Sequence, residues 1–169
     1  QKDGSKTEGV LRVMQGVIYS FLSSVPVAKL HINVIDCENH GNSVSSFYEV
    51  KRKMPELFGE KIYTDSEDAT ELIRGLNDKI EYISQDLLGT QYSSIFGYAR
   101  YNPDTDFTVE LLTIFDFPKG TDEHSLKHLR NIIANGPKCG IYTFIVGSPD
   151  ISPDMYSREY IDNLKKIKS

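Results

Sequence analysis

The segment Gly4-Ser5-Lys6-Thr7 near the N-terminus has the residue types of a phosphate-binding loop that opens a helix. In such a loop, backbone amides at the helix N-terminus and a lysine ammonium hold the phosphates of a nucleotide. These four residues are therefore candidates for nucleotide binding. The pattern is incomplete, because a serine stands before the lysine where a working loop needs a glycine, and the earlier glycine position would lie before Gln1. The alternative is a polar helix start, which we favour.

Asp116 follows a nearly continuous apolar run over residues 107–115, the pattern of a Walker B strand, whose aspartate organises magnesium in ATPases. An active ATPase usually carries a second carboxylate directly after this aspartate, where it polarises the attacking water. Phe117 occupies that position, and a phenyl ring cannot accept a proton. We therefore expect no catalytic residue and poor hydrolysis or none, with Asp116 as the Walker B-like candidate.

Asp36 ends a second apolar run, over residues 30–35, and joins the candidate nucleotide-binding residues. A carboxylate at the end of a buried strand can hold a metal or a water molecule. It can equally cap the turn that follows the strand, and we favour this second role.

Two pairs of residues have spacings that occur in metal sites. His124 and His128 lie four residues apart on an expected helix, and Cys37 with His40 would make half of another site. The sequence offers no third ligand near either pair. We therefore expect solvated side chains and no metal.

Composition and charge exclude several classes of protein. The 169 residues, 39% of them apolar, fit one globular domain. The net charge of −5 argues against direct nucleic-acid binding. We interpret the basic cluster at Lys165, Lys166 and Lys168 as the solvated end of a helix. No apolar run approaches the roughly 20 residues that cross a bilayer, so we expect no membrane insertion. Two distant cysteines favour a cytoplasmic location.

Apolar spacing predicts helices that alternate with strands. The expected helices cover residues 8–25, 43–57, 69–88, 121–135 and 155–167, with a short helix in the aromatic stretch 92–101. The expected strands cover residues 30–35, 107–115 and 140–146, with a brief strand at 58–63. This order indicates an α/β domain with a mostly parallel sheet, whose ligands bind beyond the carboxyl ends of the strands.

Local signals predict where two of these helices begin and end. Thr64 and Glu67 have the spacing of a capping box before the longest helix. Thr121 or Asp122 is expected to cap the following long helix. The segment Asn135-Gly136-Pro137 is expected to end that helix by supplying a left-handed residue and a breaker.

Several segments, in a shared order over most of residues 4–147, resemble the FtsK/SpoIIIE family of P-loop ATPases. They are Leu30-His31-Ile32-Asn33-Val34-Ile35-Asp36, Tyr63-Thr64-Asp65, the helix over 69–87, the Tyr98 loop, Leu112-Thr113-Ile114-Phe115-Asp116 and the corner over 135–145. Asp116-Phe117-Pro118 is most similar to the degenerate first ATPase module that precedes an intact one in tandem proteins.

The resemblance implies a three-layer RecA-like domain over residues 1–150, followed by a C-terminal helix or linker over 151–169. It implies a non-catalytic module that is structural or regulatory in a larger DNA translocase, beside neighbouring ATPase modules of the same or another chain. Double-stranded DNA would be contacted only through the full assembly, and we expect no cofactor. It also implies that the first strand, central between the two aspartate-bearing strands, is missing, which leaves a gap or an open edge.

Two alternatives remain open. The first is an active ATP-binding motor domain of a DNA translocase or a type VII secretion ATPase, in which Lys6, Thr7 and Asp116 bind ATP and magnesium with glycines supplied upstream of Gln1. The second is a free-standing α/β binding protein unrelated to motors.

Overall fold

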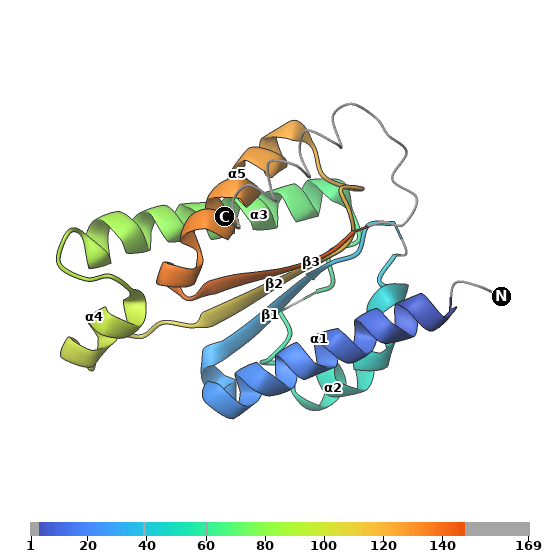
Figure 1. Ribbon diagram of the computed structural model, residues 1–169, viewed down its shortest axis with the longest axis horizontal. Coiled ribbons are helices and arrows are strands. Elements are labelled where there is room, and N and C mark those ends of the chain that lie inside the picture. The colour runs from blue at the N-terminus through green and yellow to red at the C-terminus, as the bar shows by residue number, and fades with distance from the viewer. Residues whose placement is uncertain (1–3, 39, 60, 148–169) are drawn as a thin grey trace.

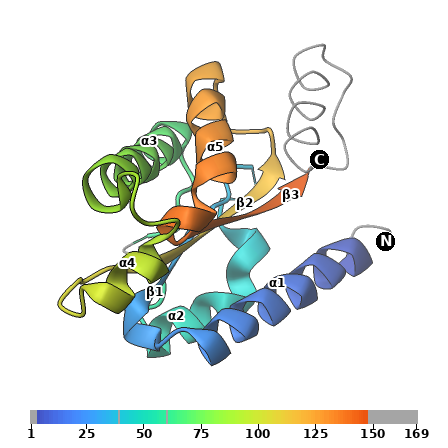
Figure 2. The ribbon, with the colours of Figure 1, turned by 60° about the vertical axis from the view of Figure 1, so that its left-hand side comes forward.

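The computed structural model describes residues 4–38, 40–59 and 61–147, which form three layers (Figure 1). A parallel sheet lies in the middle, with α1 and α2 on one face and α3 and α5 on the other (Figure 2). The helices are α1 Gly4–Ser24, α2 Tyr48–Lys53, α3 Ser66–Tyr82, α4 Ile95–Tyr101 and α5 Glu123–Asn135. Shorter helical turns cover Val27–Lys29, Asn42–Phe47, Ile83–Leu88 and Pro137–Cys139. The strands are β1 Leu30–Ile35, β2 Val109–Phe117 and β3 Ile141–Gly147, so the expected α/β fold class is confirmed.

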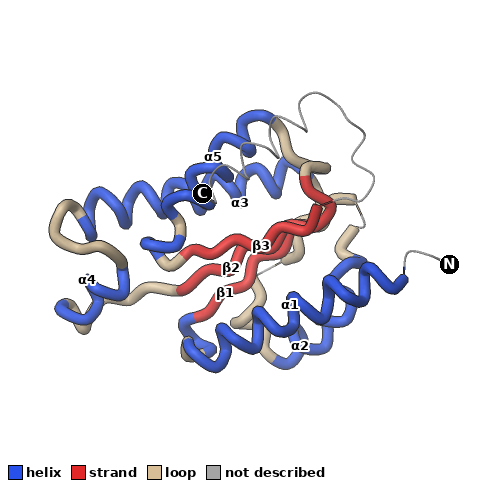
Figure 3. The backbone as a smooth tube through the Cα atoms, in the orientation of Figure 1, coloured by secondary structure: helices blue, strands red, loops and turns tan. Residues whose placement is uncertain are grey.

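All three strands are parallel, in the order β1-β2-β3 (Figure 3). β1 pairs with β2 along its whole length, and β2 pairs with β3 with one irregularity between Ile114 and Phe117. Helices connect the strands because parallel neighbours need crossover connections. The sheet is covered on both faces, which explains why β1 and β2 have nearly continuous apolar sequences.

The two faces of β2 belong to different hydrophobic cores. Leu112 and Ile114 pack in the core under α3 and α5, whereas Leu111 and Phe115 pack in the core that includes Met14 of α1. Successive side chains of a strand point to opposite faces, so one strand supplies both layers. β2 is thus the central strand of the described domain.

Within the described part of the chain, the outer edge of β1 carries two isolated bridges, between Ile32 and Phe58 and between Ile35 and Tyr63. These bridges stand where the sequence predicts a brief strand over residues 58–63. Backbone hydrogen bonds accompany both bridges, from the Gly59 amide to the Ile32 carbonyl and from the Tyr63 amide to the Val34 carbonyl. The predicted strand is thus present as two bridged positions among its described residues.

The predicted position of the missing strand is wrong. β1 and β2, which carry Asp36 and Asp116 at their carboxyl ends, pair directly and leave no gap between them. Among the described residues, no strand pairs with the outer edge of β3. The open edge of the sheet therefore lies at β3.

Asp65, and not Thr64, caps α3. Its Oδ1 accepts hydrogen bonds from the amides of Glu67 and Asp68, at 2.8 and 3.3 Å. One carboxylate thereby satisfies two free amides, which replaces the predicted capping box. Asp122 caps α5, as one of the two alternatives predicted.

The corner between α5 and β3 reverses later than predicted. Gly136 has a right-handed φ of −56°, and the left-handed residue is Gly140, with φ +80°. A turn over Pro137–Cys139 separates the two glycines because the chain first tightens into a 3-10 turn.

The helix expected over 155–167 and the lysines at its end lie outside the described residues. No described helix is long and apolar enough to cross a membrane.

Candidate functional site

The carboxyl ends of β1 and β2 bring two aspartates to the edge of the sheet where ligands of parallel sheets bind. Asp36 follows β1 and is fully buried. Its Oδ2 accepts a hydrogen bond from the Ser43 amide at 3.0 Å, and its own amide donates to the Tyr63 carbonyl at 2.9 Å. Asp36 therefore holds the loop after β1, the capping role favoured from the sequence. Nucleotide contact by Asp36 stays a prediction.

Asp116 is the last residue but one of β2. It lies at the irregularity in the pairing with β3. Its φ is +53°, a left-handed conformation that aspartate adopts more readily than most residues. Phe117, the next residue, is 2% exposed and packs in the core under α3 and α5. The position where an active ATPase carries a second carboxylate is thus filled by a buried phenyl ring.

The loops that follow the two strands are held against each other. A Cβ atom on Gly120 would lie 2.6 Å from the Cys37 Cβ, so only glycine fits at this crossing, where φ is also +72°. Lys119 Nζ and Glu38 Oε1 form an ion pair at 2.8 Å across the same loops. Burial, together with Asp65 and Asp36, raises the pKa of the Cys37 thiol, so this cysteine is not an activated nucleophile.

The candidate phosphate-binding residues Gly4, Ser5, Lys6 and Thr7 form the first turns of α1. The backbone here is already helical, as the alternative of a polar helix start predicts. The N-terminus of α1 lies at the same end of the molecule as the carboxyl ends of the strands (Figures 1 and 2). The fold therefore places the start of α1 at the end of the sheet where Asp36 and Asp116 lie. Nucleotide binding by Gly4, Ser5, Lys6 and Thr7 stays a prediction.

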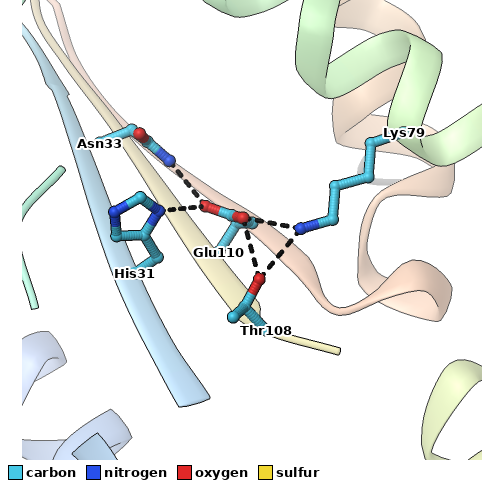
Figure 4. Close-up of polar contacts among 5 residues, drawn as sticks. All are labelled: His31, Asn33, Lys79, Thr108 and Glu110. Carbon is cyan, nitrogen blue, oxygen red and sulfur yellow. Dashed lines mark hydrogen bonds and ion pairs between the residues drawn. The ribbon is translucent and has the colours of Figure 1, made fainter. Parts of the chain in front are cut away.

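A second polar cluster lies near the opposite end of the sheet and was not predicted from the sequence (Figure 4). Glu110 of β2 is at its centre, with a side chain that is 8% exposed. Glu110 Oε1 accepts from Lys79 Nζ of α3 at 2.7 Å, and Oε2 accepts from Asn33 Nδ2 of β1 at 2.8 Å. His31 Nδ1 lies 3.4 Å from Oε2, and Thr108 Oγ1 donates to Oε1 at 3.2 Å. Two strands and one helix thus converge on one carboxylate.

The electrostatics of this cluster favour an ionised carboxylate. Burial raises the pKa of Glu110, but the His31 hydrogen bond and the Lys79 charge outweigh it and hold the pKa at about 2. The contact with Glu110 in turn raises the pKa of His31. A carboxylate with so low a pKa is a poor general base near neutral pH, so the cluster is suited to fixing α3 on the sheet.

The metal-site candidates are distributed as follows. His124 is exposed and His128 is half-buried on α5, and their Nε2 atoms are 3.2 Å apart. Cys37 is half-buried and His40 is exposed on the loop after β1. Within the described ranges, no group of three or more His, Cys, Asp or Glu residues gathers as a metal site.

The fold and the paired strand ends define a RecA-like α/β domain, and comparisons with solved structures agree. EssC (ATPases 2 and 3) from Geobacillus thermodenitrificans superposes with a TM-score of 0.61 at 19% identity, over 90% of this chain and 28% of that one. The pCW3 conjugation coupling protein TcpA, solved with ATPγS, gives 0.59 at 15% identity, over 79% and 38%. Thermomonospora curvata EccC (ATPases 2 and 3), in complex with a signal sequence peptide, gives 0.54 at 16% identity, over 84% and 23%.

These likenesses establish the RecA-like fold. At the sequence level, no protein-family model and no curated protein matches the chain. The chain spans between 23% and 38% of the length of these solved proteins, two of which are named for more than one ATPase unit. The structural similarity is thus to one part of larger ATPases.

Proposed function

We propose that this chain is a non-catalytic RecA-like module of a larger ATPase of the FtsK/SpoIIIE type. It packs beside an active module and stabilises or regulates that neighbour. The observation that carries the proposal is Phe117, buried in the core at 2% exposure directly after Asp116. A buried phenyl ring can neither orient nor deprotonate the attacking water, so the site lacks its general base.

The assembly that we propose is a double-stranded DNA translocase on the cytoplasmic side of the membrane. The net charge of −5 supports contact with DNA only through the full assembly, because the averaged field of this chain repels phosphate. Type VII secretion ATPases are the alternative assembly, since EssC and EccC share the fold. We expect no bound cofactor in the isolated chain.

A second candidate function is an active motor domain that binds ATP and magnesium. The observation that favours it is the N-terminus of α1, which lies at the end of the sheet where Asp36 and Asp116 lie (Figure 1). A helix N-terminus in that position can receive phosphate groups. With glycines supplied upstream of Gln1, Lys6, Thr7 and Asp116 would hold the nucleotide and its magnesium ion.

Phosphate release from ATP in the presence of Mg²⁺ separates the two functions. The chain should release phosphate at the background rate, and Asp116→Ala and Lys6→Ala should give the same rate. Circular dichroism shows whether the variants keep their fold. Turnover above background in the parent chain that Asp116→Ala abolishes would reject the non-catalytic module and support the motor.

A further inference from the structure

His124 and His128 form a close pair on α5, where His124 is exposed and His128 is half-buried. Their Nε2 atoms are 3.2 Å apart, their ring centroids are 4.7 Å apart, and the ring planes are inclined by 84°. The residues lie one helical turn apart, so the helix backbone fixes where both rings are attached. The same nitrogen of each ring thus faces its neighbour.

This separation fits a metal ion bound by both nitrogens. Zinc–imidazole bonds measure about 2.0–2.1 Å, and two such bonds that end 3.2 Å apart enclose an angle of about 103° at the metal. A tetrahedral site needs about 109°. The two rings therefore need only a slight adjustment to coordinate one ion.

We propose that α5 binds one divalent transition-metal ion, of the zinc and nickel class, through Nε2 of His124 and of His128. The described residues offer no group of three or more ligands, so this part of the chain supplies these two, and other groups, such as water or a second protein, complete the coordination. Such a site binds more weakly than a four-ligand structural zinc site. It is suited to reversible binding at the surface.

The proton balance of this binding is simple. For two neutral rings without metal, one Nε2 must carry the proton of this hydrogen bond and the other must accept it, and either ring can be the donor. When the ion binds, the donor ring carries its proton on Nδ1 instead, and both Nε2 lone pairs become available. Two neutral imidazoles thus become two ligands without net proton release.

The charges around the pair are balanced. Asp122 and Glu123 precede it on the chain, whereas Lys127 and Arg130 lie on the same helix. Neither sign dominates, so long-range attraction contributes little. Selectivity should therefore follow imidazole chemistry, which suits zinc and nickel and not the oxygen-preferring magnesium and calcium ions.

Isothermal titration with Zn²⁺ and Ni²⁺, in a buffer that does not chelate, tests the site. The chain should bind one ion, and His124→Asn or His128→Asn should each weaken binding by about tenfold or more, because outer-shell changes alone cost 10–100-fold. The double variant should not bind. His40→Asn is the matched control: His40 is exposed and has a φ of 49°, a conformation that asparagine tolerates, so binding should not change.

Imidazole resonances give a second, independent measurement. In a long-range proton–nitrogen correlation spectrum, Zn²⁺ should shift the ring signals of His124 and His128 together and leave those of His40 in place. Equal affinity in the parent chain and both single variants would reject the site, as would Mg²⁺ binding at the pair with the same affinity as Zn²⁺.

Discussion

At the scale of single residues, Glu110 is the buried charge that links α3 to the sheet, through its ion pair with Lys79. Its carboxylate is buried, yet it receives hydrogen bonds or ion pairs from β1, α3 and the residue that precedes β2. Buried charges are costly unless every lone pair is satisfied, and removal of one partner leaves the others uncompensated. The cluster is therefore sensitive to substitution and to pH.

Glu110 should make the domain less stable in acid. Its pKa of about 2 in the folded chain lies below the ordinary value of 4.5, so its contribution is complete above pH 4.5 and is lost as the pH falls toward 2. A shift of this size corresponds to about 3 kcal/mol. Urea unfolding at a series of pH values should show this fall.

The raised pKa of His31 acts in the opposite sense. Its contribution to the free energy of unfolding is complete below the pKa of the unfolded chain and is lost as the pH rises through the pKa of the folded chain.

Glu110→Gln isolates this contribution. The variant should be less stable than the parent chain at pH 7, and the difference should shrink between pH 5 and 3 because the parent loses its charge interaction there. Glu56→Gln, at an exposed position in the turn after α2, is the matched control and should follow the parent at every pH. If Glu110→Gln ran parallel to the parent across this range, the charge of Glu110 would not stabilise the fold.

Single residues were also where the sequence was least informative. Asn33 and Glu110 stand inside runs that the apolar pattern assigns to buried strands, and their polarity was the one available signal. Lys79 lies 31 positions from Glu110 in the chain, so no local spacing indicates their contact. The chemistry of Asp116 and Phe117 could be predicted from the sequence, because the residue type at a motif position decides whether the side chain can bind a metal ion or accept a proton.

At the scale of elements, β3 is the strand with an open side. Two bridges cover the outer edge of β1, whereas no described segment pairs with the outer edge of β3. An open strand edge leaves amide and carbonyl groups for another strand to pair with. Phe21 of α1 packs against Tyr142 of β3, with ring centroids 5.1 Å apart, so a strand beside β3 would lie close to α1.

Extension of the chain upstream of Gln1 should stabilise it. About fifteen natural residues are enough for one strand and a short loop, and each new hydrogen bond contributes about 1 kcal/mol. Each kcal/mol should raise the melting temperature by about 2–4 °C for a domain of this size. An equally long glycine–serine extension is the control and should have no effect. An unchanged melting temperature with the natural extension would mean that this edge takes no upstream strand.

The elements themselves were largely predictable from the sequence. β1 matches the predicted range because its apolar-rich run has clear ends between Lys29 and Asp36, and the apolar face of α3 repeats every three or four residues. The caps were less certain: adjacent Thr64 and Asp65 can both cap a helix, and only the backbone geometry selects the aspartate. Strand order depends on contacts distant in sequence, so the site of the open edge was predicted wrongly.

At the scale of the whole molecule, the RecA-like fold and the negative net charge favour different conclusions about contact with DNA. The fold is shared with parts of larger proteins, of which one is named a conjugation coupling protein and another was solved in complex with a signal sequence peptide. The charge of −5 disfavours a phosphate backbone. In the assembly that we propose, contact with DNA should therefore belong to other parts.

The isolated chain should bind duplex DNA weakly or not at all. A titration at increasing salt measures this, because phosphate contacts lose affinity steeply as counterion release weakens. Any residual binding should disappear when Lys165, Lys166 and Lys168 are changed to glutamine. Submicromolar affinity at about 150 mM salt with a steep salt slope would contradict the expectation that this chain does not hold DNA itself.

We infer that this RecA-like domain does not turn over ATP. The most direct test uses a longer chain, in which the residues that the motor alternative requires are present. ATP turnover with Mg²⁺ is measured on the chain extended upstream by about fifteen natural residues, enough to complete a phosphate-binding loop and its strand. Phosphate release should stay at background, equal to that of the same chain carrying Asp116→Ala, because Phe117 leaves no group to activate water. Turnover well above background that Asp116→Ala abolishes would contradict this inference.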